Sequence, residues 1–358
     1  MGIVRTEESD RREIEELRRM LVSVHRRKDD EDFRGTRLLS NDEDQEEKVV
    51  CVTSGVSFLG LAIVNRLLLR RYSVRIILDN QEDVEKLREL ENRGEMRTNN
   101  NNVSVITAKL TQVEDLVQAF DGCRGVFHTS AFSDPAGLSG YSKSMAEIEV
   151  KAAQNVVKAC ARTPSVRNCV LTSSLLACSW RDGAAAQDLS PVVNHDSWSD
   201  ESLCINKKLW YALGKLKSEK AAWKLAEGSG FKLATICPGL ITGPDFIDRN
   251  PTATIAYLKG AQEMYTNGVL ATVDVMRLAD SHVCLYEEMN KTASGRYICF
   301  DRVIESEDEA EKLAKEMGMP VNKLCGNACE NIPCHFKLSN KKLTSLMSRT
   351  IRTCYNQS

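Results

Sequence analysis

Short apolar segments alternate with segments of helical periodicity over most of the chain from Val49 onward. The apolar segments are interpreted as strands: VVCVTS from residue 49, SVRIIL at 73–78, VSVITAKL from 103, GVFHTSAF from 125, VRNCVLTSS from 166 and FKLATICPGL from 231. Helical stretches between them end near Leu68 or span about 82–91, 113–120, 145–161 and 209–227. Because strands that alternate with helices are typical of a parallel sheet covered on both faces, the pattern predicts an α/β fold with a doubly wound parallel sheet.

Two parts of the chain depart from this rhythm. Residues 1–47 contain 25 Asp, Glu, Lys or Arg, and the spacing of Ile14, Leu17, Leu21 and Val24 predicts one short amphipathic helix there. We interpret this extension as partly ordered, with its helix laid on the body of the protein; the alternative is a helix that binds a protein partner. After about residue 245 the alternation loosens, and TVDVMRLADSHVCLYEE and GRYICFD are expected in a smaller part.

Charge and composition narrow the class of protein. The net charge of −2 gives no field that favours nucleic acid or an anionic membrane as a partner. The chain has no apolar run of the roughly 18 residues needed to span a bilayer, and its charged beginning lacks the apolar core of a signal peptide. Met1-Gly2 followed by Thr6 fits a loose myristoylation pattern without a second membrane signal, so no stable membrane anchor is expected. We expect a cytoplasmic protein.

The 13 cysteines are expected to be reduced and buried, because several lie within apolar segments and none forms a Cys-x-x-Cys pair. One cluster, Cys325, Cys329, Cys334 and His335, has the residue types of a zinc site. Its spacing differs from that of a zinc knuckle, so no metal is predicted.

The turn after the first strand has the position of a nucleotide-binding loop. In the G-x-x-G-x-x-G register the three glycine positions hold Ser54, Ser57 and Gly60, with Gly55 out of register. The second glycine of such a motif lets the backbone approach a pyrophosphate, and the third lets the helix pack closely. A serine at position 57 adds a Cβ and a hydroxyl there, so the turn, which also includes Phe58 and Leu59, is expected to bind a dinucleotide more weakly.

A second group of residues carries candidate chemistry. Tyr211 and Lys215 are four residues apart and therefore share one helix face, where the ammonium is expected to lower the pKa of the phenol. Ser173 and Ser174 close the strand VRNCVLTSS, and ligands of open α/β sheets bind outside the carboxyl ends of strands. A serine hydroxyl there is positioned to hold a carbonyl oxygen.

The order of TSS, HDSWSDESLC, WYALGK, KAAW, CPGLITGP and SGRYICFD resembles the plant extended short-chain dehydrogenase/reductases, especially the cinnamoyl-CoA reductase-like group within the cinnamoyl-CoA and dihydroflavonol reductases. The resemblance covers about residues 48–350. It implies an NAD(P)-binding Rossmann core over about 48–245, a substrate-binding part mainly at 246–350 and a tail at 351–358. It also implies reduction of a phenylpropanoid-type CoA thioester or related carbonyl by NAD(P)H. Ser174 would hold the oxygen, Tyr211 would donate the proton, and Lys215 would bind the nicotinamide ribose.

The resemblance further assigns residues around the cofactor. Thr129, Ser130 and Ala131 end a strand that faces the cofactor cleft, and Pro238, Gly239, Leu240 and Ile241 are expected beside the nicotinamide. His128 and His282 are expected to be core residues, and Trp198, Trp210 and Trp223 packing residues.

Several positions depart from the family. Asp79 stands where these reductases carry an Arg for the NADP phosphate, so NADP is expected from the family but Asp79 favours NAD. Lys109 replaces an Asp before Leu110, and Lys151 replaces an Asn. The changed cofactor turn and the charged extension leave a second hypothesis, a catalytically weak or inactive sensor or scaffold that keeps the reductase fold.

Overall fold

The computed structural model describes residues 49–96, 102–129, 141–181, 192–326 and 336–355. The strands are β1 (Val49–Val52), β2 (Ser73–Leu78), β3 (Val103–Thr107), β4 (Gly125–His128), β5 (Asn168–Thr172), β6 (Val192–Val193), β7 (Lys232–Pro238), β8 (Leu240–Thr242), β9 (Ala271–Asp274), β10 (Gly295–Cys299), β11 (Arg302–Val303) and β12 (Lys337–Leu338). The described residues up to Thr350 belong to one compact unit. The predicted N-terminal helix lies outside the described residues.

The larger helices are α2 (Phe58–Leu69), α3 (Gln81–Asn92), α4 (Val113–Phe120), α5 (Lys143–Arg162), α8 (Trp210–Ala226), α12 (Val275–Met289), α13 (Glu307–Glu316) and α15 (Lys341–Tyr355). The shorter helices are α6 (Leu176–Ser179), α7 (Glu201–Asn206), α9 (Phe246–Arg249), α10 (Pro251–Tyr257), α11 (Ala261–Thr266) and α14 (Asn322–Cys325). Helix α5 is longer than the sequence pattern predicts because Ser142 caps it, accepting a hydrogen bond from the backbone N–H of Met145.

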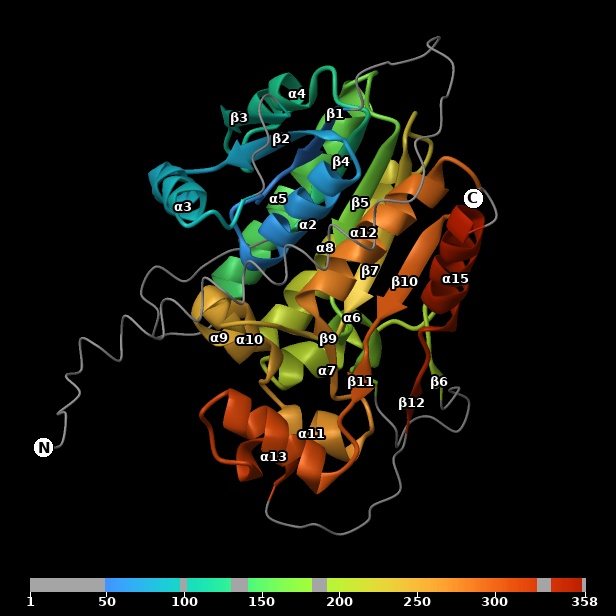
Figure 1. The fold of residues 1–358 in the computed structure, drawn as a ribbon. Helices are drawn as coiled ribbons and strands as arrows, with labels where there is room; N and C mark the ends of the chain where they lie inside the picture. Colours follow the sequence, from blue (N-terminus) through green and yellow to red (C-terminus); the bar gives the residue numbers. More distant parts are fainter. Residues whose placement is uncertain (1–48, 97–101, 130–140, 182–191, 327–335, 356–358) are drawn as a thin grey trace, which may run out of the picture. The chain divides into compact units, whose positions relative to one another are not determined.

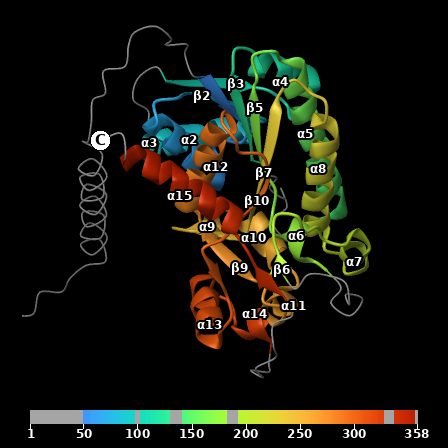
Figure 2. The same ribbon diagram turned by 90° about the vertical axis from the view of Figure 1, so that its right-hand side faces the viewer.

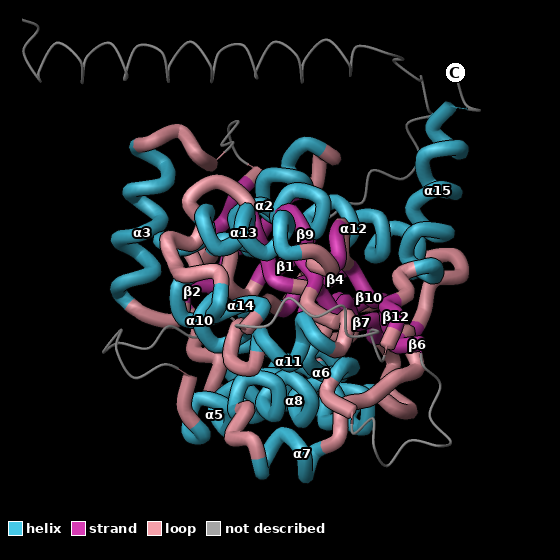
Figure 3. The backbone as a smooth tube through the Cα atoms, turned by 90° about the horizontal axis from the view of Figure 1, so that it is seen from below, coloured by secondary structure: helices cyan, strands magenta, loops and turns pink. Residues whose placement is uncertain are grey.

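A seven-stranded sheet with the order β10-β7-β5-β4-β1-β2-β3 forms the centre of the described chain (Figure 1). Each neighbouring pair in this sheet is parallel. Helices α2 and α12 lie on one side of the strands, and α5 and α8 lie on the other (Figure 3). The doubly wound parallel sheet predicted from the alternation is therefore confirmed.

Side chains of one strand serve two separate cores. Val50 and Val52 of β1 belong to a hydrophobic cluster with α2 and α12, whereas Cys51 between them belongs to a cluster with α4 and α5. This division follows from the two-residue period of a strand, which turns successive side chains to opposite faces. A strand buried on both faces is apolar throughout, which is why the sequence pattern located β1.

The last strand of the central sheet corrects an expectation. We expected GRYICFD in the smaller part, but it forms β10, which pairs with β7 through Gly295 and Ala234 at the sheet edge. The burial of four successive residues in β10 is the reason, because only a strand covered on both faces accommodates such a run. Helix α12 likewise packs on the large sheet, beside α2 (Figure 2).

A three-stranded sheet, β11-β9-β8, and the helices α10, α11, α13 and α14 make up the other part of the described fold. Its core includes Leu270, Leu313 and Leu324. None of the helices in the described ranges has both the length and the apolar character that crossing a bilayer requires.

Chain order reverses between β1 and β4, because the chain moves outward from β1 through β2 to β3 before returning to β4. In doubly wound sheets a crevice opens at this switch point, outside the carboxyl ends of the strands. The turn after β1 and the residue after β4, Thr129, both lie at this place in the topology. The fold thus positions the sequence-predicted turn where a ligand crevice is expected.

Candidate active site

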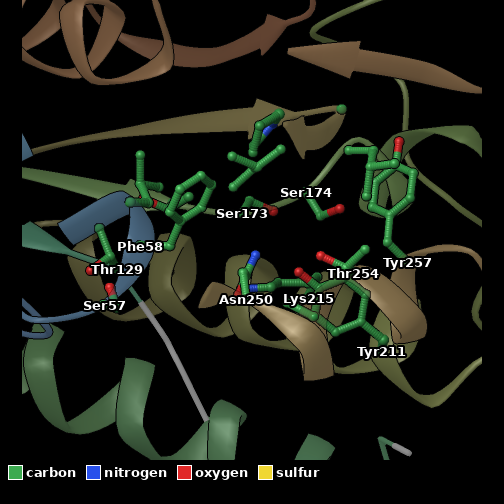
Figure 4. A pocket seen from close by; sticks show the side chains of 17 residues that line it. Ser57, Phe58, Thr129, Ser173, Ser174, Tyr211, Lys215, Asn250, Thr254 and Tyr257 are labelled. Carbon is green, nitrogen blue, oxygen red and sulfur yellow. The ribbon is translucent and has the colours of Figure 1, made fainter. Parts of the chain in front are cut away.

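Two adjoining cavities lie at the carboxyl ends of these strands. The first, called the central cavity, is lined by Thr129, Ser174, Tyr211, Lys215, Pro238, Gly239, Leu240 and Ile241, among others. The second, called the turn cavity, is lined by Ser54, Asp79, Leu110 and Lys215, among others. Ser57, Phe58 and Tyr211 border both, and Leu59 borders the central cavity. Figure 4 shows Ser174, Tyr211 and Lys215 gathered around one space.

Ser57 begins helix α2 and holds the turn closed. Its backbone is extended, and its Oγ accepts a hydrogen bond from the Gly60 N–H at 3.1 Å. The same hydroxyl donates to the backbone oxygen of Ser54 at 2.7 Å. The Ser57 hydroxyl therefore uses its proton within the turn in this structure.

Both glycines of the turn are required by close contacts. A Cβ on Gly60 would lie 1.9 Å from the backbone oxygen of Ser54, so the third position of the motif admits no side chain. A Cβ on Gly55 would lie 2.7 Å from a methyl group of Ile76 on β2. Neither Gly55 nor Gly60 is among the residues that line the two cavities. Both glycines therefore allow the close packing of the turn without lining either cavity.

Helix α8 carries Tyr211 and Lys215 on one face, as the four-residue spacing predicts, and the Lys215 Nζ lies 5.5 Å from the centroid of the Tyr211 ring. The helix packs closely on α5, since a Cβ on Gly214 would lie 3.1 Å from the Cα of Ala146. This close approach brings α5 side chains next to Lys215.

Glu149 of α5 is a site residue that the sequence reasoning missed. Its Oε1 lies 2.6 Å from the Lys215 Nζ, and the two side chains are 3% and 5% exposed. The Tyr141 hydroxyl donates a hydrogen bond to Glu149 Oε2, and the Tyr141 ring meets Tyr211 edge-on with 5.0 Å between centroids. A signal existed, because Glu149 lies three residues after Ala146 and four before Ala153, on the mostly apolar buried face of α5.

The pKa of the Tyr211 phenol is raised in the structure, whereas the sequence analysis expected Lys215 to lower it. Burial raises the pKa of the Tyr211 phenol, the Lys215 ammonium lowers it, and the Glu149 carboxylate raises it; the net pKa is raised. Burial disfavours the Lys215 ammonium, but Glu149 and Tyr211 outweigh this effect and raise the pKa of Lys215. The four-residue spacing identifies the cation beside Tyr211 but not the anion that pairs with that cation.

The two serines after β5 have different roles. Ser173 donates its hydroxyl proton to Glu219 Oε2 at 2.7 Å, within a buried group that also joins Glu219 to Arg296. Ser174 Oγ accepts from the Leu176 N–H at 3.2 Å, which leaves the hydroxyl proton for the central cavity. Of the two serines, Ser174 therefore keeps a hydroxyl proton available at the central cavity, whereas Ser173 uses its proton on Glu219.

Asp79 lies in the turn cavity at the end of β2. Its Oδ1 accepts a hydrogen bond from the Leu110 N–H at 2.8 Å, and its own N–H donates to the Asp83 carboxylate at 3.0 Å. Asn80, Glu82, Asp83 and Lys86 line the same cavity. A second anion close to this aspartate makes the region acidic, with Lys86 as a nearby cation.

Some predicted residues do not reach the cavities. The Lys109 side chain is exposed and is not among the lining residues of either cavity. Lys151, at the position of the family's asparagine, is also exposed. Ser130 and Ala131 lie outside the described residues, as do Cys329, Cys334 and His335 of the considered zinc cluster. The described residues contain no group of three or more ligands arranged for a metal ion.

The predicted core residues hold other parts of the fold together. His282 is buried between Thr172 and the Leu278 carbonyl, with both ring nitrogens at 2.8 Å from their partners. His128 is buried against Thr53. The cysteines whose side chains the structure describes are free and buried, as expected.

The tryptophans take part in packing to different degrees. The Trp198 ring stacks against Arg296, whose guanidinium carbon lies 3.5 Å from the ring centroid. Trp223 packs against the core around α5. Trp210 packs in the smaller core and also lines a third cavity next to the site.

Helix α10 supplies lining residues that the sequence did not reveal. Asn250, Thr254 and Tyr257 face Ser174 and Tyr211 across the central cavity (Figure 4). The Thr254 Oγ1 is buried and has no hydrogen-bond partner among the described residues, and the same is true of Thr129 Oγ1. Buried hydroxyls without partners are costly, so these two are candidate positions for hydrogen bonds to a ligand.

A third, apolar cavity of about 540 Å³ lies on the other side of Tyr211. Its apolar lining includes Trp180, Leu209, Trp210, Ile255, Leu258 and Met319. Lys259 and Lys323 also border it. Tyr211 borders all three cavities, so its hydroxyl-bearing ring stands between a polar region and an apolar one.

Comparison with known proteins identifies the family. The sequence profile of the 3-beta hydroxysteroid dehydrogenase/isomerase family matches residues 51–309. The chain belongs to this family. Cinnamoyl-CoA reductase 1 of Petunia hybrida is 35% identical over 84% of this chain and 86% of its own length. Tetraketide alpha-pyrone reductase 1 of Arabidopsis thaliana is 32% identical over 78% of this chain and 85% of its own.

Solved structures agree with this assignment. The structure of vestitone reductase from alfalfa (Medicago sativa) matches with a TM-score of 0.59 and 26% sequence identity. The match covers 83% of this chain and 91% of the reductase chain. The yeast methylglyoxal/isovaleraldehyde reductase Gre2, whose structure holds NADPH, shares the fold at 22% identity with a TM-score of 0.61, over 84% of this chain and 93% of its own. As a member of the 3-beta hydroxysteroid dehydrogenase/isomerase family, the chain is a nicotinamide dinucleotide-dependent oxidoreductase.

Proposed function

We propose that the chain reduces a phenylpropanoid-type CoA thioester or a related carbonyl compound, with Ser174, Tyr211 and Lys215 as its catalytic residues. The observation that carries this proposal is the convergence of these three side chains on one cavity, beside the turn of a dinucleotide-binding fold.

The residues present fit a nicotinamide dinucleotide. The turn at Ser54 to Ser57 would hold the pyrophosphate at the start of α2, and Leu110 and Asp79 would border the adenosine. Lys215 would bind the nicotinamide ribose, and the orphaned Thr129 Oγ1 and the segment Pro238–Ile241 would lie beside the nicotinamide. The bound cofactor supplies the hydride.

The chemistry of the chain's own residues is proton transfer and orientation. The Ser174 hydroxyl donates a hydrogen bond to the substrate oxygen, and Tyr211 gives its proton to the same oxygen as negative charge develops there. Burial and Glu149 raise the pKa of the Tyr211 phenol, so Tyr211 is protonated before the reaction and can transfer its proton as negative charge develops on the substrate oxygen. For a ketone the product is an alcohol; for a thioester it is a thiohemiacetal, whose C–S bond then breaks as the hydroxyl proton passes to the departing CoA sulfur, leaving an aldehyde and free CoA.

Substrate class is inferred from the apolar cavity beside Tyr211. Two tryptophans, Trp180 and Trp210, and several aliphatic side chains line this cavity, which suits an aromatic or aliphatic group attached to the reacting carbon. The cinnamoyl-CoA reductases among the relatives support a thioester, and the tetraketide alpha-pyrone reductases support a ketone.

We further propose NADH as the preferred cofactor. Asp79, Glu82 and Asp83 line the turn cavity at the end of β2, where the 2′-phosphate of NADP would meet negative charge. The Asp79 carboxylate keeps an oxygen for ribose hydroxyls while its other oxygen is held by Leu110.

The test is an assay of the purified full chain with NADH or NADPH and a panel of cinnamoyl thioesters, flavanonols and small aldehydes. Oxidation of NADH by one of the aromatic substrates is the expected result. Consumption of neither cofactor with any substrate would refute the proposal and favour a sensor or scaffold.

A further inference from the structure

A carboxylate stands between two helices at the place where the catalytic lysine is expected to act. Glu149 on α5 and Lys215 on α8 form an ion pair of 2.6 Å in which both side chains are almost wholly buried. A buried ion pair of this kind costs desolvation energy, and removal of either member leaves an uncompensated charge. Glu149 therefore belongs to the electrostatics of the site.

We propose that Glu149 is a positioning residue that fixes the Lys215 ammonium and offsets the positive charge acting on Tyr211. This inference rests on the proposed function, because it assumes that Tyr211 and Lys215 perform the reaction. It extends that function by naming the group that sets the pH range over which the pair works.

Glu149 is linked to Tyr211 by two independent paths. Through Oε1 it holds the Lys215 ammonium, which lies 5.5 Å from the Tyr211 ring centroid. Through Oε2 it accepts from the Tyr141 hydroxyl, and the Tyr141 ring packs edge-on against Tyr211. The Glu149 carboxylate thus orients both the Lys215 ammonium and the Tyr141 ring, which lie next to Tyr211.

The other titratable groups around Glu149 and Lys215 are uncharged near neutral pH. From β4, burial lowers the pKa of His128 to about 4, so this imidazole is neutral. Burial raises the pKa of Tyr141 and of Tyr257 on α10. A side-chain hydrogen bond with Cys178 and burial raise the pKa of Cys237 on β7. The loss of turnover at alkaline pH is therefore expected to depend on Glu149, Lys215 and Tyr211.

Removing the charge of Glu149 is expected to lower the pKa of Lys215 and that of Tyr211. Without the carboxylate, burial lowers the pKa of Lys215, and the lysine loses its proton at a lower pH. Where Lys215 is still charged, its field on Tyr211 is no longer offset, so the pKa of the phenol also falls. Reduction needs a protonated Tyr211 and a charged Lys215, and both are lost at lower pH in such a variant.

The experiment compares Glu149→Gln with the wild-type chain over a range of pH. We expect the alkaline limb of the turnover profile for reduction to move down by about one pH unit or more. Glu147→Gln removes the same charge from an exposed position of α5 and is the matched control. Its profile is expected to coincide with that of the wild type.

NADH affinity over the same pH range gives a second readout that does not depend on turnover. Cofactor fluorescence is expected to show that Glu149→Gln loses affinity at lower pH than the wild type, since Lys215 deprotonates earlier. Glu149→Asp keeps the charge but withdraws it by one methylene, so it is expected to shift both profiles less than Gln does. If the Gln variant does not fold, this smaller shift carries the test.

Turnover and binding profiles of the Glu149 variants that coincide with those of the wild type would overturn the inference. The proposed function fails by a different result: a wild-type chain without turnover, or a Tyr211→Phe variant with full turnover. In that case the NADH-binding profiles still decide whether Glu149 controls Lys215.

Discussion

The Ser57 hydroxyl and the Ser54 carbonyl close the dinucleotide turn upon itself with a hydrogen bond of 2.7 Å. A turn with glycine at position 57 would leave its backbone open to a pyrophosphate. The Ser57 side chain therefore does not abolish the turn but gives it an internal hydrogen bond that a phosphate must displace or accommodate.

Ser57→Gly is expected to bind NADH more tightly, by roughly threefold to tenfold or about 1 kcal/mol, because the backbone can then approach the pyrophosphate. The loss of the cap to the Gly60 N–H is expected to cost a few tenths of a kcal/mol in the free energy of unfolding, about the usual effect of glycine at an N-cap. Fluorescence titration and urea unfolding measure the two effects. Weaker binding by the variant would mean that the Ser57 hydroxyl itself serves the phosphate.

Asp79→Asn is expected to increase NADPH affinity by about tenfold, because one negative charge is removed from the region facing a 2′-phosphate. NADH affinity is expected to change little. The control is Glu85→Gln on helix α3, which follows Asp79 in the chain. Glu85 is exposed and does not line the turn cavity, so this variant is expected to leave the affinities for NADH and NADPH unchanged. Tighter binding of NADPH than of NADH by the wild type would contradict the role given to Asp79.

Thr254→Val tests whether the orphaned hydroxyl in the central cavity serves the substrate. Valine has nearly the same shape, and the lost hydroxyl has no partner among the described residues, so the free energy of unfolding is expected to be unchanged or higher by about 1 kcal/mol. The KM for substrate is expected to rise while NADH affinity stays the same. A destabilised variant with an unchanged KM would show that the hydroxyl has a structural role instead.

Acid stability is expected to depend on His282. Burial lowers the pKa of this imidazole from 6.5 to about 4, so between these values the unfolded chain binds a proton that the folded chain does not. The contribution is present in full above pH 6.5 and is lost as the pH falls toward 4, by about 3 kcal/mol in the free energy of unfolding. Urea unfolding at several pH values is the measurement. His282→Gln is expected to be less stable at pH 7 but to lose less stability on acidification; a parallel decline in both proteins would contradict the assignment.

The sequence was sufficient for the central strands and for the Tyr211–Lys215 pair because both depend on local patterns. Strand β2 coincides with SVRIIL, since an apolar β-branched run bounded by turns has few alternatives. A four-residue spacing on a helix fixes a shared face without knowledge of the tertiary structure.

The parts that the sequence could not supply depend on contacts between distant segments. The spacing of Glu149 from Ala146 and Ala153 places it on one face of α5, but only the packing of α5 on α8 shows that Glu149 is buried against Lys215 while Glu147 is exposed. Strand β10 belongs to the central sheet because it pairs with β7, more than 50 residues earlier in the chain. Thr254 and Tyr257 become site residues only when α10 is placed across the cavity.

The most direct test of the account is the turnover of Tyr211→Phe beside that of the wild type, with NADH and the best substrate of the panel. Phenylalanine keeps the ring that borders the three cavities but removes the proton donor. We predict that kcat falls by about 100-fold or more while NADH affinity is unchanged, as expected when a general acid is lost. Equal turnover by the two proteins would show that Tyr211 is not the proton donor.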